Sequence, residues 1–313
     1  MQISPLSKKE NSAFIQLLKL CGFIAIGIIV ILIISFVPIL YTLGLKVFTN
    51  PTLLVGFNYG VVALKCILTL QQLTVFLIPA IFLGINEGKK PWHFYGMKTP
   101  KANLILLIFL LMLCSTPILG LINELNQKMI LPDSLKWVMD WMRKMEDEGT
   151  KTTEAILKMG SIGSFLINLL VIAIIPAICE EFIFRGALQR TFLRLIKNPH
   201  IAIWTSAIIF STIHFQFFGF FPRLFLGAAF GYIYFWTGSI WYTVFAHFLN
   251  NGYAVAMAWY LQKHNLPITS DDGTSVAWYG YLISAILTIA LFWILKEKST
   301  EQNSPQPANL NED

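Results

Sequence analysis

Long apolar runs are the feature of this sequence that most limits how it can fold. One of them, CGFIAIGIIVILIISFVPIL at residues 21–40, contains no charged residue. A bilayer core about 30 Å thick is crossed by roughly 20 apolar residues in a helix, because each residue adds about 1.5 Å. The runs therefore predict an all-α polytopic membrane protein with about eight transmembrane helices. The predicted spans are residues 20–43, 60–85, 103–123, 163–193, 199–218, 223–237, 239–261 and 275–295.

The composition agrees with this class of protein. Of 313 residues, 56 % are hydrophobic and 13 % are charged, which is too little charge to cover the surface of a soluble domain of this size. The net charge of +6 comes mostly from short loops, so it indicates membrane orientation and attraction to anionic lipid. We therefore expect the lipid bilayer as a partner and no nucleic-acid partner.

Basic residues mark alternate connections between the predicted spans. Because basic loops tend to stay in the cytoplasm, this pattern places both termini there. A chain of this kind without an organelle signal suggests a multi-pass protein of a bacterial inner membrane. The basic residues used are Lys8, Lys9, Lys89, Lys90, Lys98, Lys101, Arg190, Arg194, Lys197, Lys296 and Lys298.

The chain divides into three parts by composition. Residues 1–19 are predicted to form a cytoplasmic tail, and residues 20–298 form the helical bundle. Residues 299–313 read STEQNSPQPANLNED, a polar segment that we expect to be disordered.

The connection before the fourth span contains LPDSLKWVMDWMRKMED, residues 131–147. Leu135, Val138, Met142 and Met145 recur at helical spacing, with charged residues on the opposite face. This pattern predicts an amphipathic helix. It is compatible with a helix in the membrane interface and with a helix packed on the bundle.

Three charges interrupt the fourth span in the stretch ICEEFIFRG, residues 178–186. Ionisable residues within spans are rare, and their default interpretation is functional. Glu181 and Arg185 are four residues apart, so on a helix they lie on the same face and can neutralise each other. Glu180 points about 100° away from that face and lacks this partner. A carboxylate in this position is a candidate general base.

Other polar residues occur in later spans. His214 lies in the predicted fifth span, and His247 and Asn251 lie four residues apart in the seventh. Together with Glu180 they are suited to activate a water molecule and to stabilise an oxyanion. A zinc site of Glu180, His214 and His247 is an alternative, as are a proton or ion pathway and simple helix packing. The sequence contains no HExxH, GxSxG or GxGD motif of other intramembrane hydrolases.

Three motifs in this order resemble the CPBP or Abi family of intramembrane endopeptidases, which are related to CAAX prenyl proteases. They are EExxxR at residues 180–185, FxxxH at residues 210–214 and HxxxN at residues 247–251. The resemblance covers about residues 163–261 and implies a catalytic core there. It implies that Glu180 and His214 activate water, that His247 and Asn251 stabilise the oxyanion, and that Glu181 and Arg185 support the site.

The resemblance predicts an intramembrane endopeptidase that hydrolyses a peptide bond in a membrane-embedded or lipidated protein or peptide. The family has been described both as metal-dependent and as metal-free, so whether the protein uses a divalent metal cofactor such as zinc is left open. Asn251 is a poor zinc ligand and a good oxyanion donor, which favours a metal-free mechanism. The alternative function is a non-proteolytic membrane immunity or scaffold protein of the same family.

Overall fold

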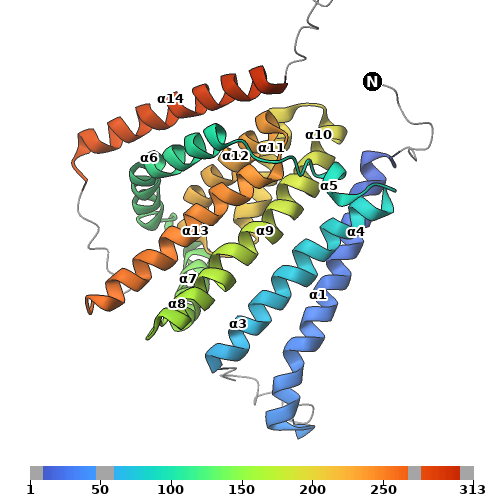
Figure 1. Cartoon of the computed structure of the whole chain (residues 1–313). Helices are drawn as coiled ribbons and strands as arrows, with labels where there is room; N and C mark the ends of the chain where they lie inside the picture. Colours follow the sequence, from blue (N-terminus) through green and yellow to red (C-terminus); the bar gives the residue numbers. More distant parts are fainter. Residues whose placement is uncertain (1–9, 47–59, 267–275, 304–313) are drawn as a thin grey trace, which may run out of the picture.

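Each of the eight predicted apolar runs forms a helix. The computed structural model describes residues 10–46, 60–266 and 276–303, and no strand occurs in these ranges (Figure 1). The helices of the apolar runs are α1 (Ala13–Leu43), α3 (Gly60–Gln71) continued by α4 (Ile78–Asn86), α6 (Ala102–Gln127), α8 (Ile162–Asn168) continued by α9 (Ile175–Glu181) and α10 (Arg190–Ile196), α11 (Pro199–Thr212), α12 (Phe220–Thr237), α13 (Ile240–Lys263) and α14 (Trp278–Asn303).

Two of these runs contain wide π-helical turns. In the second run, η2 (Gln72–Leu77) connects α3 to α4. In the fourth run, η4 (Leu169–Ile174) precedes α9 and η5 (Phe182–Gln189) follows it. Such turns are rare and are often found at functional sites. The remaining elements are α5 (Pro91–Phe94), η3 (Asp133–Leu135), α7 (Lys136–Leu157) and η6 (Phe217–Gly219).

The all-α polytopic class is confirmed, but the predicted number of eight spans is not. Among the described residues, six helices are long and apolar enough to cross a membrane: Ala13–Leu43, Gly60–Asn86, Ala102–Gln127, Ile162–Ile196, Phe217–Thr237 and Trp278–Thr300. Helix α11 has only 14 residues, fewer than a bilayer requires. Helix α13 has 24 residues, but His247, Asn250 and Asn251 lower its mean hydropathy.

Both ends of the predicted bundle need correction. Helix α1 begins at Ala13, inside the predicted N-terminal tail, and Ser12 caps it by accepting a hydrogen bond from the Ile15 N–H. Helix α14 continues to Asn303, so the first residues of the predicted polar tail are helical. Residues 304–313 lie outside the described residues, as do Lys8 and Lys9.

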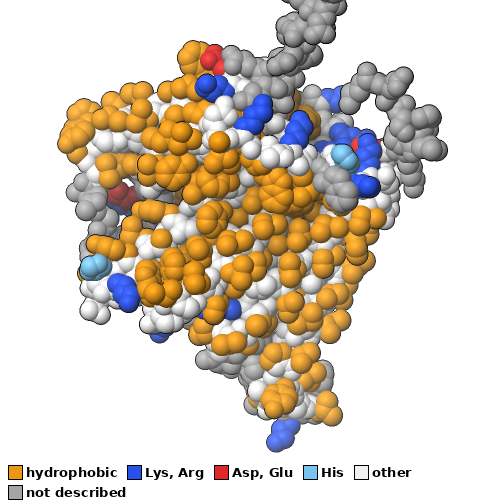
Figure 2. Space-filling view, viewed as in Figure 1, with side chains coloured by type: hydrophobic (Ala, Val, Ile, Leu, Met, Phe, Trp, Pro, Cys, Tyr) orange, Lys and Arg blue, Asp and Glu red, His pale blue; other side chains and the backbone are white. Residues whose placement is uncertain are grey.

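The surface between the two ends of the molecule is mostly apolar. Figure 2 shows hydrophobic side chains over this region, with Lys and Arg side chains near its ends. Exposed apolar residues are numerous on α1 and α14, for example Leu32 (64 % exposed) and Ile289 (70 % exposed). A protein in water would hide such a surface, whereas lipid chains solvate it. This supports the assignment as a multi-pass membrane protein.

The start of α1, the end of α4 and helix α10 meet at one end of the molecule, called here the basic end (Figure 1). Glu10 lies at its centre and forms ion pairs with Lys89 at 3.0 Å, Arg190 at 2.8 Å and Arg194 at 3.0 Å. These three cations belong to the basic connections that the sequence placed on one side of the membrane. Their grouping in space agrees with that prediction.

The segment before α6 also reaches the turn between α12 and α13. The Ile240 N–H donates to the Gly96 carbonyl at 3.3 Å, and Ser239 Oγ donates to the Lys98 carbonyl at 2.8 Å. A Cβ atom on Gly96 would lie within 2.4 Å of the Gly238 carbonyl oxygen. Gly96 also has φ +63°, so only glycine fits this contact without strain.

The predicted amphipathic helix is present as α7. Its Met142 is buried, whereas Trp137 is 72 % exposed. Helix α7 packs on the segment between α11 and α12, where Trp141 lies 5.0 Å from Phe217 between ring centroids. The apolar face predicted from the spacing is therefore used, at least at Met142, to cover the bundle.

Candidate functional site

The ion pair predicted within the fourth run is present. Arg185 Nη1 donates to Glu181 Oε1 at 2.8 Å, and Arg185 Nη2 donates to the Gly227 carbonyl of α12 at 2.9 Å. Glu181 and Arg185 are both almost fully buried, at 0 % and 1 % exposed. The Arg185 guanidinium also lies over the rings of Phe210 and Phe230, at 4.8 and 5.3 Å from their centroids. Its charge is therefore compensated on several sides.

Glu181 has a second partner, which the sequence did not predict. His247 Nδ1 lies 2.8 Å from Glu181 Oε1, the same oxygen that binds Arg185. A carboxylate can only accept at this position, so Nδ1 carries the proton. The other ring nitrogen, Nε2, is then an acceptor in the neutral ring. The ring is also stacked on Phe230 at 5.4 Å. Glu181 and Phe230 thus fix both the tautomer and the orientation of His247.

Glu180 is not isolated, although it lacks an arginine partner as predicted. Its Oε1 accepts a hydrogen bond from Gln72 Nε2 at 2.8 Å, and its Oε2 lies 3.8 Å from His247 Nε2. Glu180 is 6 % exposed.

His214 does not lie within a helix, so its predicted place inside a span is wrong. Helix α11 ends at Thr212, and the His214 ring Nδ1 lies 2.7 Å from the Phe210 carbonyl. In a continuing helix the backbone N–H of residue 214 would donate its hydrogen bond to that carbonyl. Here the His214 ring binds the carbonyl instead, and the next residue, Phe215, has φ +52°. His214 nevertheless lies near the site, because the Phe210 ring contacts both His214 and His247.

The Phe210 ring contacts both histidines. Its ring centroid lies 5.0 Å from that of His214 and 6.0 Å from that of His247. Because a carbonyl only accepts, His214 Nδ1 is the donor to Phe210, and its Nε2 is left as an acceptor in the neutral ring. The two imidazoles thus each present an acceptor nitrogen.

Asn251 lies one turn beyond His247 on α13, as predicted, but its amide is already bonded. Asn251 Nδ2 donates to the Ile172 carbonyl at 3.2 Å, and its Oδ1 accepts from Asn250 Nδ2 at 3.1 Å. Pro176 has no N–H to offer the carbonyl of residue 172. Asn251 supplies a donor to that carbonyl and so links α13 to the π-helical turn η4.

A divalent metal at Glu180, His214 and His247 stays a prediction. Among the described residues, no three His, Cys, Asp or Glu side chains are grouped so that they could hold a metal ion. The acceptor nitrogen of His247 faces Glu180, and its other nitrogen is used by Glu181.

Gln72 and the ring of Phe230 are parts of the site that sequence reasoning missed. The sequence did show Gln72 as a polar residue inside a span, which is a functional signal. Its partner, Glu180, lies 108 positions further along the chain. A single sequence does not reveal which helices are neighbours, so this contact could not be predicted.

Comparisons with known proteins agree with the motifs. A model of the family described as "Type II CAAX prenyl endopeptidase Rce1-like" matches residues 162–253. In Bacillus subtilis (strain 168), the uncharacterized protein YpbD is 29 % identical over 86 residues, which cover 26 % of this chain and 41 % of YpbD. The chain thus matches about two fifths of the length of this relative. No solved structure matches the chain.

The matched range contains all six predicted site residues: Glu180, Glu181, Arg185, His214, His247 and Asn251. The resemblance predicted from the motifs is therefore confirmed over this part of the chain. Residues 162–253 are thus similar to the Rce1-like type II CAAX prenyl endopeptidases.

Proposed function

We propose that this protein is an intramembrane endopeptidase that hydrolyses a peptide bond in a membrane-embedded or lipidated substrate. The observation that carries the proposal is the buried pair of Glu180 and His247. Their nearest side-chain atoms, Oε2 and Nε2, lie 3.8 Å apart, longer than a hydrogen bond. Both atoms are acceptors when Glu180 is ionised and His247 is neutral. A water molecule has the two donors needed to bridge them.

In this mechanism Glu180 is the general base. The water oxygen attacks the carbonyl carbon of the scissile bond while Glu180 takes the proton, and the same carboxyl group then protonates the leaving amine. His247, held by Glu181, orients the water. His214, which also contacts Phe210, offers a further acceptor nitrogen.

Oxyanion stabilisation by His247 and Asn251 stays a prediction. His247 can donate through Nε2 only when its ring carries both protons. Asn251 Nδ2 carries two N–H groups, so it can donate one to the Ile172 carbonyl and the other to an oxyanion.

Purified protein in detergent tests the proposal with a library of peptides, each present with and without a prenyl group near its C-terminus. Mass spectrometry would identify cleaved bonds. We expect cleavage of some library members by the wild type and a loss of about 10²–10⁴-fold in His247→Gln, because a glutamine amide does not place an acceptor where the His247 ring, held by Glu181, places Nε2. His264→Gln is the matched control, since His264 is an exposed histidine just beyond α13.

The proposal fails if His247→Gln cleaves as fast as the wild type. It also fails if no library member is cleaved in any lipid or detergent in which the protein stays folded. In that second case the non-proteolytic immunity or scaffold role becomes the better account of the site.

A further inference from the structure

The segment Ile213–Gly219 between α11 and α12, called here the His214 loop, includes the 3₁₀ turn η6, and its Gly219 N–H donates to the Gln216 carbonyl at 3.3 Å. It leaves the helix after Thr212 and turns at Phe215, which has a positive φ of 52°. Such a conformation is unfavourable for a phenylalanine and persists only when surrounding contacts impose it. The bond of His214 to Phe210 is one such contact.

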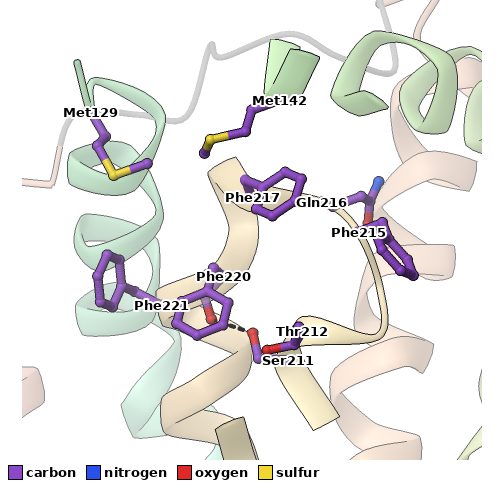
Figure 3. Close-up of a pocket in the computed structure, with 9 residues that line it drawn as sticks. All are labelled: Met129, Met142, Ser211, Thr212, Phe215, Gln216, Phe217, Phe220 and Phe221. Atoms are coloured by element: carbon purple, nitrogen blue, oxygen red, sulfur yellow. Dashed lines mark hydrogen bonds between the residues drawn. The ribbon is translucent and has the colours of Figure 1, made fainter. Parts of the chain in front are cut away.

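One side of the loop borders an apolar cavity of about 250 Å³. Figure 3 shows Phe215, Gln216 and Phe217 of the loop around it, with Met129 and Met142 opposite. A cavity supplies no packing partners to the residues that line it. The loop must therefore be held from its other sides.

Arg223 of α12 holds the loop at Gln216. Its Nη1 donates to Gln216 Oε1 at 3.1 Å, and its Nη2 donates to the Gln216 backbone carbonyl. The guanidinium packs over Gly219, where a Cβ atom would lie 2.9 Å from Nη1 and Nη2. A planar fork of two donors fixes both the backbone and the side chain of Gln216, two residues after His214.

Helix α7 holds the next residues from outside. Glu146 Oε2 accepts a hydrogen bond from the Phe218 N–H at 3.3 Å, and the Arg143 guanidinium lies 3.6 Å from the Phe218 ring centroid. The loop is thus held between Arg223 of α12 and charged residues of the amphipathic helix α7.

We propose that Arg223 is a positioning residue of the site, which holds the His214 loop through Gln216 and so keeps His214 against Phe210, whose ring also contacts His247. Arg223 does not touch the reacting atoms in this account. The inference rests on the proposed function, because it assigns His214 a place in the reaction.

The first arm of the test does not need a substrate. Protein labelled with ¹⁵N-histidine gives imidazole signals in NMR spectra, and His214→Gln identifies the signals of His214. In Arg223→Gln we expect the His214 signals to shift or broaden while those of His93, His200 and His264 stay unchanged. Arg194→Gln is the matched control, because it removes a paired guanidinium at the basic end. Unchanged His214 signals in Arg223→Gln would overturn the inference.

The second arm measures cleavage of a library peptide that the wild type cuts. Misplacement of a catalytic group by about 1 Å lowers rates by about 100-fold, so Arg223→Gln should lower kcat by about 10- to 100-fold with little change in KM. The kcat of Arg223→Lys should lie between those of the wild type and Arg223→Gln, because the lysine ammonium keeps the charge but lacks the planar pair of donors. If Arg223→Gln does not fold, Gln216→Ala is measured in its place. It should also lower kcat, by a smaller factor.

The two arms separate the possible failures. A higher KM with unchanged kcat and unchanged His214 signals would contradict positioning and assign Arg223 to substrate binding. If wild-type protein cleaves nothing while the His214 signals respond to Arg223→Gln, the proposed function fails and the positioning contact stands.

Discussion

At the scale of single residues, one oxygen atom organises the site. Glu181 Oε1 accepts from both Arg185 Nη1 and His247 Nδ1, each at 2.8 Å, and all three side chains are buried. The spacing of EExxxR predicted half of this arrangement, because residues four apart share a helix face. The contact between His247 and Glu181 depends on how α13 packs against α9, which local sequence does not encode.

Glu181→Gln should strongly destabilise the protein. It leaves the Arg185 guanidinium buried without its carboxylate, and breaking a buried pair in this way costs about 3–5 kcal/mol of the free energy of unfolding. Thermal unfolding in detergent measures the effect. Glu124→Gln, which breaks an exposed pair with Lys128, should change that free energy by less than about 1 kcal/mol.

The double variant Glu181→Gln, Arg185→Met should recover part of the lost stability, because it removes the unpaired charge. If Glu181→Gln is as stable as the wild type, the Gly227 carbonyl and the two phenylalanine rings alone are enough to stabilise the buried charge of Arg185.

At the scale of elements, apolar run length and period placed all eight helices. They did not show that α11 is shorter and α13 more polar than the six helices that are long and apolar enough to cross a membrane. Nor did they show the π-helical turns, since a wide turn changes the period over only a few residues. His214 was misplaced for a related reason: FSTIHFQFF is apolar enough to continue a helix. Its ring instead binds the last free carbonyl.

Helix α12 packs closely against α11 at Gly231, and Gly231→Ala should disrupt this contact. The added Cβ would lie 2.7 Å from both Gln189 Oε1 and Ile203 Cγ2, whose side chains are buried. We expect a loss of about 1–3 kcal/mol in the free energy of unfolding. Gly120→Ala in α6 is the control, because its Cβ would meet nothing within 4 Å. Equal stabilities of the two variants would contradict the close packing.

At the scale of the whole molecule, the basic end joins the N-terminal residues to the run that carries the site. Glu10 binds Arg190 and Arg194 of α10, and its side chain is 14 % exposed. Although burial raises it, hydrogen bonds from Arg190 and Lys89 lower the pKa of Glu10 from 4.5 to about 2. The ionised carboxylate therefore stabilises the folded state.

Because the folded pKa is depressed, this contribution is fully present above about pH 4.5 and is lost as the pH falls towards 2. It amounts to at most about 3 kcal/mol. Glu10→Gln should lower the unfolding temperature at pH 7 and show a smaller further decrease between pH 4.5 and 3 than the wild type. Parallel curves for the two proteins would contradict a role for Glu10 in joining these elements.

The central claim is that Glu180 activates a water molecule for hydrolysis within the membrane. The most direct measurement is cleavage of a library peptide in H₂¹⁸O by wild-type protein and Glu180→Gln, followed by mass spectrometry. The wild type should place one ¹⁸O atom in the new C-terminal carboxylate. Glu180→Gln should lower kcat by about 10²–10⁴-fold while the protein remains folded. A Glu180→Gln variant that cleaves at the wild-type rate would contradict the claim.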